Sequence, residues 1–186
     1  PPCYPAVARL IHAGPPSEPI CWWGEDYRYI QTTPASAFSA EGGAWSTGHG
    51  RGHYENWGAP GDTLRFTVTP NNTGNHLLQV VYGNGSNGTD TGITSAVKQV
   101  QVVDEEGTVV SQGVLLMPQR GDWANWGDSS FVSATLTAGQ TYTVIIEDGF
   151  NMSHLDHYTD YTGGPGGGES PYNYVNISEF KLLFRE

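Results

Sequence analysis

The chain has 186 residues, a formal net charge of −11 at pH 7, and charged residues at only 15% of its positions. The chain has 8 Lys and Arg residues, too few to form the basic surface that binds nucleic acid or an anionic membrane, so we expect neither as a partner. Its length suits one domain with a sizeable core. The 25 Gly, 12 Pro and 12% aromatic residues are typical of an all-β extracellular domain with long loops.

Residues 1–38 are predicted to form an irregular arm packed on the domain, because prolines recur along it and interrupt strand pairing. The chain has two cysteines, Cys3 and Cys21, and both lie in this arm. We expect them to form a disulfide that pins the arm, which implies a secreted protein. Two free thiols in a cytosolic protein are the alternative. Because the sequence opens at Pro1, we expect that a signal peptide was removed or that the segment was cut from a larger protein.

Residues 39–186 are predicted to form a β-sandwich of the jelly-roll type. From Thr63 onward apolar and polar residues alternate, which is typical of strands with one buried face. Short turns rich in Gly, Asn and Asp separate the alternating segments. The predicted strands are residues 63–69, 76–82, 96–103, 108–116, 131–136, 141–147 and 174–184.

Residues 83–88 match the G-x-G-x-x-G pattern of dinucleotide-binding loops and follow a predicted strand. In that motif a helix must come next, because its N-terminus binds the pyrophosphate. Residues 89–94 contain no helix-forming run. We therefore interpret the glycines as turn formers.

Two tryptophans, Trp123 and Trp126, lie in a loop rich in Gly, Asp and Asn. Loops run over the surface, so large rings on them are either packed down or offered to a ligand. The C–H face of a sugar stacks on an indole while neighbouring amides and carboxylates bind the hydroxyls. The loop therefore favours carbohydrate recognition.

Histidines leave an enzyme open as the alternative. His53 and Tyr54 are adjacent and supply the base and acid of a polysaccharide lyase, whereas His154 and His157 lie in a long Gly-rich insert. A glycoside hydrolase that uses two paired carboxylates is a further alternative, because a sequence does not give the distance in space between two carboxyl groups. We favour polar residues around a binding face over both, and predict no catalytic residue.

From residue 39 onward the order of motifs resembles carbohydrate-binding modules of families 6 and 35, which are β-sandwich domains appended to polysaccharide-degrading enzymes. Each motif is weak alone, and their shared order carries the resemblance. The matching segments are residues 42–45 (Gly-Gly-Ala-Trp), 52–57, 61–66, 74–82, 121–126 (Gly-Asp-Trp-Ala-Asn-Trp), 136–142 and 175–180 (Val-Asn-Ile-Ser-Glu-Phe).

The resemblance implies a sugar site at the loop end of the sandwich. Tyr54 and Trp123 would provide the aromatic faces, and Asn176 would bind hydroxyls. Trp57 and Trp126 would extend the platform, although packing of Trp126 beneath the loop is an equal alternative.

The resemblance also implies a structural calcium ion held by carboxylates of the first and closing strands. Calcium prefers oxygen ligands, and the chain has 19 Asp and Glu residues against 8 Lys and Arg residues. The nearest candidates are Glu25, Glu41, Ser178 and Glu179. Ser178 stands where the family has an aspartate, and Glu179 is shifted by one residue, which points its side chain to the opposite face.

We therefore expect a non-catalytic, secreted domain that keeps an attached enzyme near a polysaccharide. The alternatives are a small jelly-roll lyase or hydrolase, and a spacer domain whose tryptophan loop packs against another domain of the parent protein.

Overall fold

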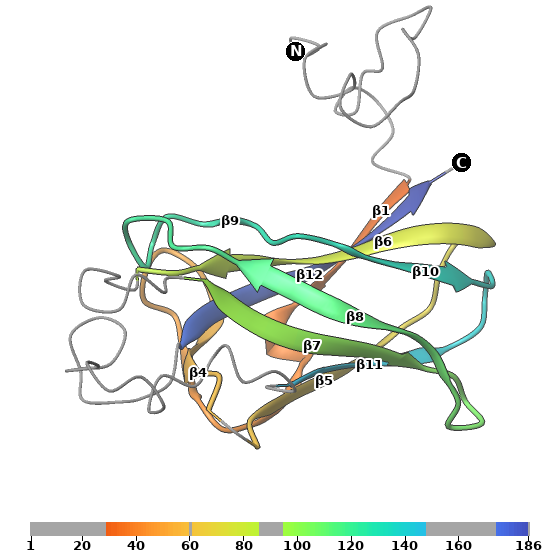
Figure 1. Cartoon of the computed structure of the whole chain (residues 1–186), viewed down its shortest axis with the longest axis horizontal. Helices are drawn as coiled ribbons and strands as arrows, with labels where there is room; N and C mark the ends of the chain where they lie inside the picture. Colours follow the sequence, from red (N-terminus) through yellow and green to blue (C-terminus); the bar gives the residue numbers. More distant parts are fainter. Residues whose placement is uncertain (1–28, 60, 86–94, 148–173, 186) are drawn as a thin grey trace, which may run out of the picture.

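The computed structural model describes residues 29–59, 61–85, 95–147 and 174–185. Within these ranges the chain forms two antiparallel sheets that face each other across a common core (Figure 1). The predicted all-β sandwich is therefore confirmed. The described residues contain one complete 3-10 turn, η2 (Ala35–Ala37), and no α-helix. No helix in this part of the chain has the length and apolar character needed to cross a membrane.

The first sheet, sheet A, is built around β12 (Val175–Arg185), the last strand of the chain. On one edge β12 pairs along its length with β6 (Gly74–Gly83). On its other edge it pairs first with β4 (His53–Trp57) and then with β1 (Ile30–Pro34). The sheet is completed by β3 (Ala44–Ser46) beside β4, and by β9 (Gly127–Asp128) and β10 (Val132–Leu136) beside β6.

The second sheet, sheet B, follows the period-two pattern of the sequence closely. In its strand β5 (Thr63–Val68), Leu64 and Phe66 are buried, whereas the alternate residues Arg65 and Thr67 are exposed. The strand order is β2 (Ser39–Glu41), β5 (Thr63–Val68), β11 (Tyr142–Glu147), β7 (Ala96–Val103) and β8 (Val109–Met117).

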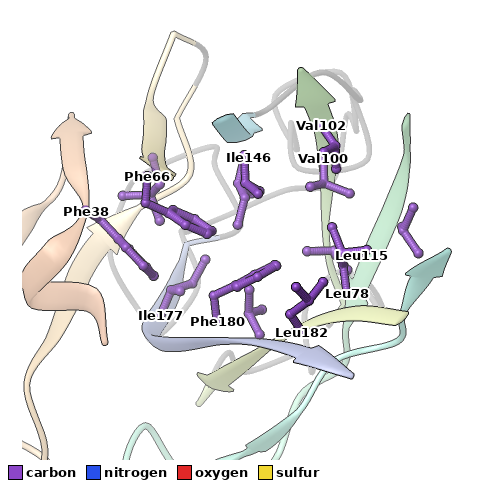
Figure 2. Packing of buried hydrophobic residues seen from close by; sticks show 14 of the residues in the cluster. Phe38, Phe66, Leu78, Val100, Val102, Leu115, Ile146, Ile177, Phe180 and Leu182 are labelled. Atoms are coloured by element: carbon purple, nitrogen blue, oxygen red, sulfur yellow. The ribbon is translucent and has the colours of Figure 1, made fainter. Parts of the chain in front are cut away.

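Aromatic rings pack between the two sheets within the core (Figure 2). Phe66 of sheet B stacks on Phe38 at 4.3 Å between ring centroids and contacts Phe180 of sheet A at 4.7 Å. Such pairs contribute about 0.5–1.5 kcal/mol each beyond the burial of their area. The core therefore fixes how the sheets face each other and, with them, the loops at their ends.

All seven predicted strands are confirmed, with ends that differ by two residues at most. The sequence missed β1 to β4 and β9, which are short. One prediction was wrong: β1 lies within the segment expected to be an irregular arm, yet it pairs with β12 from Ile30 to Pro34. Proline is tolerated there because it ends the strand. Cys3 and Cys21 lie outside the described residues, so their disulfide stays a prediction.

Candidate functional site

β12 begins at the end of the sandwich where β6 finishes (Figure 1). A small pocket lies at this end. Val175 and Ile177 are fully buried in the core, so Asn176 between them points to the outer face of sheet A. The pocket has a volume of about 120 Å³. Its lining residues are His49, Glu55, Asn56, Trp123, Tyr174 and Asn176.

A β-bulge in β4 sets which of its side chains reach this pocket. Val175 pairs with Trp57 and Ile177 with Tyr54, so β4 advances three residues while β12 advances two. The extra residue is Asn56, which has a φ of 52° in the left-handed region. As a result Tyr54 and Trp57 both point into the core, although they are an odd number of residues apart.

The loop that carries Trp123 is held by hydrogen bonds within residues 120–126. The Nε of Arg120 donates to the carbonyl oxygen of Asn125 at 2.6 Å, and the Nδ2 of Asn125 donates back to the carbonyl oxygen of Arg120 at 2.6 Å. The backbone N–H of Ala124 donates to the carboxylate of Asp122 at 2.7 Å. The loop is therefore ordered before any ligand binds, which lowers the entropic cost of binding.

Two glycines let this loop lie across the end of β6. A Cβ on Gly83 would overlap the carbonyl oxygen of Trp123, and a Cβ on Gly85 would meet Cδ1 of the Trp123 ring at 2.7 Å. Gly83 also pairs with Asn176 across the sheet. Because Gly83 has no Cβ, the indole of Trp123 and the amide of Asn176 reach the same pocket.

Tyr82, at the end of β6, anchors the beginning of the same loop. Its hydroxyl donates to the carbonyl oxygen of Pro118 at 2.9 Å, and the guanidinium of Arg120 lies 5.7 Å from its ring centroid. Burial raises the pKa of the Tyr82 phenol, while Arg120 acts in the opposite direction. The phenol is therefore protonated at neutral pH, as donation to Pro118 requires.

Trp126 supports the pocket from behind and is absent from its lining. Its indole N–H donates to the carbonyl oxygen of His49 at 2.8 Å. Its ring contacts the imidazole of His53 edge-on, with 5.2 Å between centroids, and the guanidinium of Arg51 lies 5.5 Å from its centroid. Of the two alternatives for Trp126, the packed one agrees with this position.

Tyr54 and Trp57, both predicted as sugar contacts, lie away from the pocket. Trp57 is fully buried in the core, so its indole offers no face to a ligand. Tyr54 packs against the core, and its hydroxyl donates to the carbonyl oxygen of Phe38 at 3.3 Å. Its ring meets Trp45 edge-on at 5.5 Å between centroids. The bulge at Asn56 is the physical reason why both rings turn inward.

Four pocket residues were not predicted as sugar contacts: His49, Glu55, Asn56 and Tyr174. Glu55 and Asn56 lie within a segment that carries the family resemblance and Tyr174 is next to one, whereas His49 lies between two such segments. His49 has a φ of 53°, in the left-handed region where histidine is enriched several-fold among non-glycine residues. No pattern in the sequence predicted the bulge at Asn56, which separates Glu55 from Trp57.

The described residues predicted to hold calcium lie on two different strands, and the calcium ion stays a prediction. β1, the strand beside the closing strand, reads Ile-Gln-Thr-Thr-Pro and carries no carboxylate. Glu41 is exposed on β2 of sheet B, whereas Ser178 and Glu179 belong to β12 of sheet A. The carboxylate of Glu179 lies 3.9 Å from the guanidinium of Arg51. Glu25 lies outside the described residues.

The adjacent pair His53 and Tyr54 does not form an acid–base pair for catalysis. The two side chains leave opposite faces of β4, with Tyr54 against the core and His53 on the outer face. The Nδ1 of His53 lies 2.7 Å from the carbonyl oxygen of Arg51. His154 and His157 lie outside the described residues.

Comparisons with known proteins support the fold. No family model matches the chain, and no curated protein matches it. One solved structure with a similar fold is the isomalto-dextranase of Arthrobacter globiformis T6 in complex with panose, at 18% sequence identity and a TM-score of 0.58. The match covers 85% of this chain and 24% of that enzyme, so the chain spans about a quarter of its length.

Isolated modules are similar over almost their whole length. A family 35 carbohydrate-binding module from Clostridium thermocellum matches at 13% identity with a TM-score of 0.56, covering 84% of this chain and 98% of the module. The C-terminal family 6 module of a marine laminarinase from Zobellia galactanivorans matches at 14% identity and a TM-score of 0.52, covering 83% and 99%. The resemblance to families 6 and 35 is therefore confirmed at the level of the fold.

Proposed function

We propose that this chain is a non-catalytic carbohydrate-binding domain whose ligand enters the pocket at the start of β12. The observation that carries the proposal is that Trp123 and Asn176 line one pocket, although they lie on different elements far apart in the chain. A partly exposed indole provides a stacking face for the C–H side of a sugar ring. The amides of Asn176 and Asn56 and the carboxylate of Glu55 provide donors and acceptors for hydroxyls.

The size of the pocket favours a single sugar ring. Pockets for drug-sized ligands measure roughly 300–1,000 Å³, and this one measures about 120 Å³. Trp126 helps to set the size of the pocket, because the bond from its indole N–H fixes the backbone of His49 on one side of it. The remaining sugars of a polysaccharide would extend into solvent or over neighbouring loops.

The charge of the pocket favours a neutral sugar over a uronic acid. Glu55 lines the pocket and no Lys or Arg does so among the described residues, while the chain as a whole carries a net charge of −11. An anionic sugar would therefore meet repulsion at close and at long range. The similar folds of whole enzymes and of isolated modules support a role in targeting an attached secreted enzyme to its polysaccharide.

Affinity electrophoresis against a panel of neutral and uronate-containing polysaccharides tests the proposal. We expect retardation in gels that contain a neutral glucan or a related neutral polysaccharide, with no shortening of the polymer recovered from the gel. Shortened polymer would mean an enzyme. Migration that is unchanged throughout the panel would contradict carbohydrate binding and favour a spacer domain.

A further inference from the structure

We propose that His49, His53 and Glu55 form a binding site for one divalent transition-metal ion, with Zn²⁺ as the ion that suits them best. The three side chains are the one group of three or more His, Cys, Asp or Glu residues in the described ranges whose ligand atoms gather closely enough to hold an ion. Each offers one ligand atom, and these atoms all lie within 4.8 Å of one another.

The burial of His53 and the hydrogen bond made by its Nδ1 are those expected of a metal ligand. Its side chain is fully buried, and its Nδ1 lies 2.7 Å from the carbonyl oxygen of Arg51. A carbonyl only accepts, so Nδ1 carries a proton, and the neutral imidazole has its free lone pair on Nε2. Metal-bound histidines show this second hydrogen bond, which fixes the ring and its tautomer. The Nε2 itself has no hydrogen-bond partner among the described residues.

A buried nitrogen without a hydrogen bond is costly, and the ligand atoms of His49 and Glu55 lie within 4.8 Å of that of His53. Side chains two apart on a strand share a face, so β4 presents His53 and Glu55 together. The His49 ring lies 5.6 Å from the His53 ring between centroids. Trp126 holds the backbone of His49 at this place through the bond from its indole N–H. The arrangement is therefore fixed by packing outside the cluster.

The distances match zinc coordination. The Nε2 of His53 and the Oε2 of Glu55 are 3.4 Å apart. Two ligand atoms that each lie about 2.0–2.1 Å from a tetrahedral zinc ion are separated by about 3.4 Å. The first two ligands thus stand at coordination distance already, and the third, His49, is exposed and free to adjust its side chain.

The donor set selects the kind of ion. Two imidazole nitrogens and one carboxylate oxygen suit zinc, whereas calcium takes six to eight oxygen ligands. Because His49 and Glu55 also line the pocket, the fourth coordination position of the ion would face it, so the repulsion of an anionic sugar by Glu55 applies to the metal-free pocket. The metal site does not rest on the proposed carbohydrate function, because its three ligands are grouped by the distances between their own ligand atoms; Glu55 takes part in both proposals.

Titration of metal-stripped protein with Zn²⁺ in competition with a chromogenic chelator, without any sugar, tests the site. We expect one ion per chain. We also expect affinity to fall by at least about tenfold in His53→Ala and in Glu55→Gln, since even outer-shell changes cost 10–100-fold. Glu55→Gln keeps the size of a half-buried side chain, so it serves where His53→Ala disturbs the fold. Ca²⁺ should not compete with Zn²⁺ for the site.

His76→Gln is the matched control, because His76 is also buried with its Nδ1 near a backbone carbonyl, 3.0 Å from that of Gly74, and lies outside the cluster. It should bind Zn²⁺ as the unmodified chain does. Cobalt provides a second readout: Co²⁺ should give the visible absorption of a tetrahedral site, and His49→Ala should abolish it. Zinc affinity and stoichiometry that are unchanged in all three cluster variants would overturn the proposal.

Discussion

The indole N–H of Trp126 donates to the backbone carbonyl of His49 at 2.8 Å, which joins two loops that are 77 residues apart in the sequence. His49 has a φ of 53°, in the left-handed region that non-glycine residues rarely adopt, so its backbone is strained. The bond from Trp126 compensates for part of that strain. The second tryptophan of the loop thus shapes the pocket that the first one lines.

Replacement of Trp126 by Phe should therefore weaken ligand binding without removing a ligand contact. Phenylalanine retains an aromatic ring against His53 and lacks the N–H donor, so His49 loses its anchor. We expect carbohydrate affinity to fall several-fold and the free energy of unfolding to fall by about 0.5–1.5 kcal/mol, the net value of one hydrogen bond. Calorimetric titration and urea unfolding measure the two effects. Unchanged affinity would mean that His49 keeps its place without Trp126.

Replacement of Gly83 by Ala should displace the tryptophan loop. The added Cβ would overlap the carbonyl oxygen of Trp123, which belongs to backbone and cannot rotate away. Because β6 is paired on both edges, we expect the loop to move and the strand to stay. Carbohydrate affinity should fall while far-ultraviolet circular dichroism stays the same. An alanine variant with normal affinity would show that the close approach of the loop to Gly83 is not required.

Trp57 should behave as a core residue. It is fully buried, so Trp57→Ala removes a large side chain from the interior, which costs about 3–5 kcal/mol. Trp57→Phe keeps most of the apolar volume, and it should bind carbohydrate with the affinity of the unmodified chain at a modest cost in stability. Urea unfolding and calorimetric titration of the two variants check this. Loss of carbohydrate binding in a stable Trp57→Phe variant would show that Trp57 contributes to the site.

Trp57 also shows how far the sequence predicts the site. Trp123 and Asn176 were predicted from their motifs, and they do share the pocket. Tyr54 and Trp57 were predicted in the same way, yet a single extra residue at Asn56 turns both inward. A bulge is a backbone event that depends on the neighbouring strand, so no residue pattern along β4 reveals it.

The fold was more predictable than the site because strand alternation is local. Segments such as β7 (Ala96–Val103) and β11 (Tyr142–Glu147) carry their own two-faced pattern. β1 (Ile30–Pro34) has only a partly buried face and ends at a proline, and it is a strand because β12 provides its partner. Tertiary pairing overrides weak local propensity in such short segments.

Acid should destabilise the domain through His76. Burial lowers the pKa of His76 below its usual 6.5, and its cross-strand neighbours Ala134 and Phe184 carry no charge to offset this. Between the folded and unfolded pKa values the unfolded chain binds more protons. The free energy of unfolding should therefore fall as pH drops below about 6.5. Urea unfolding at several pH values checks this, with a shallower dependence expected in His76→Gln. Equal slopes in both proteins would assign the effect to other groups.

The most direct test of the pocket compares Trp123→Ala with Trp45→Ala by affinity electrophoresis in the polysaccharide that retards the unmodified chain best. Trp45 is 46% exposed and lies outside the pocket lining, so it controls for the loss of any surface indole. We predict that Trp123→Ala loses affinity by at least about tenfold, which corresponds to about 1.4 kcal/mol, and that Trp45→Ala migrates as the unmodified chain does. Retardation that survives in Trp123→Ala, or disappears in Trp45→Ala alone, would place the sugar elsewhere and contradict the proposed site.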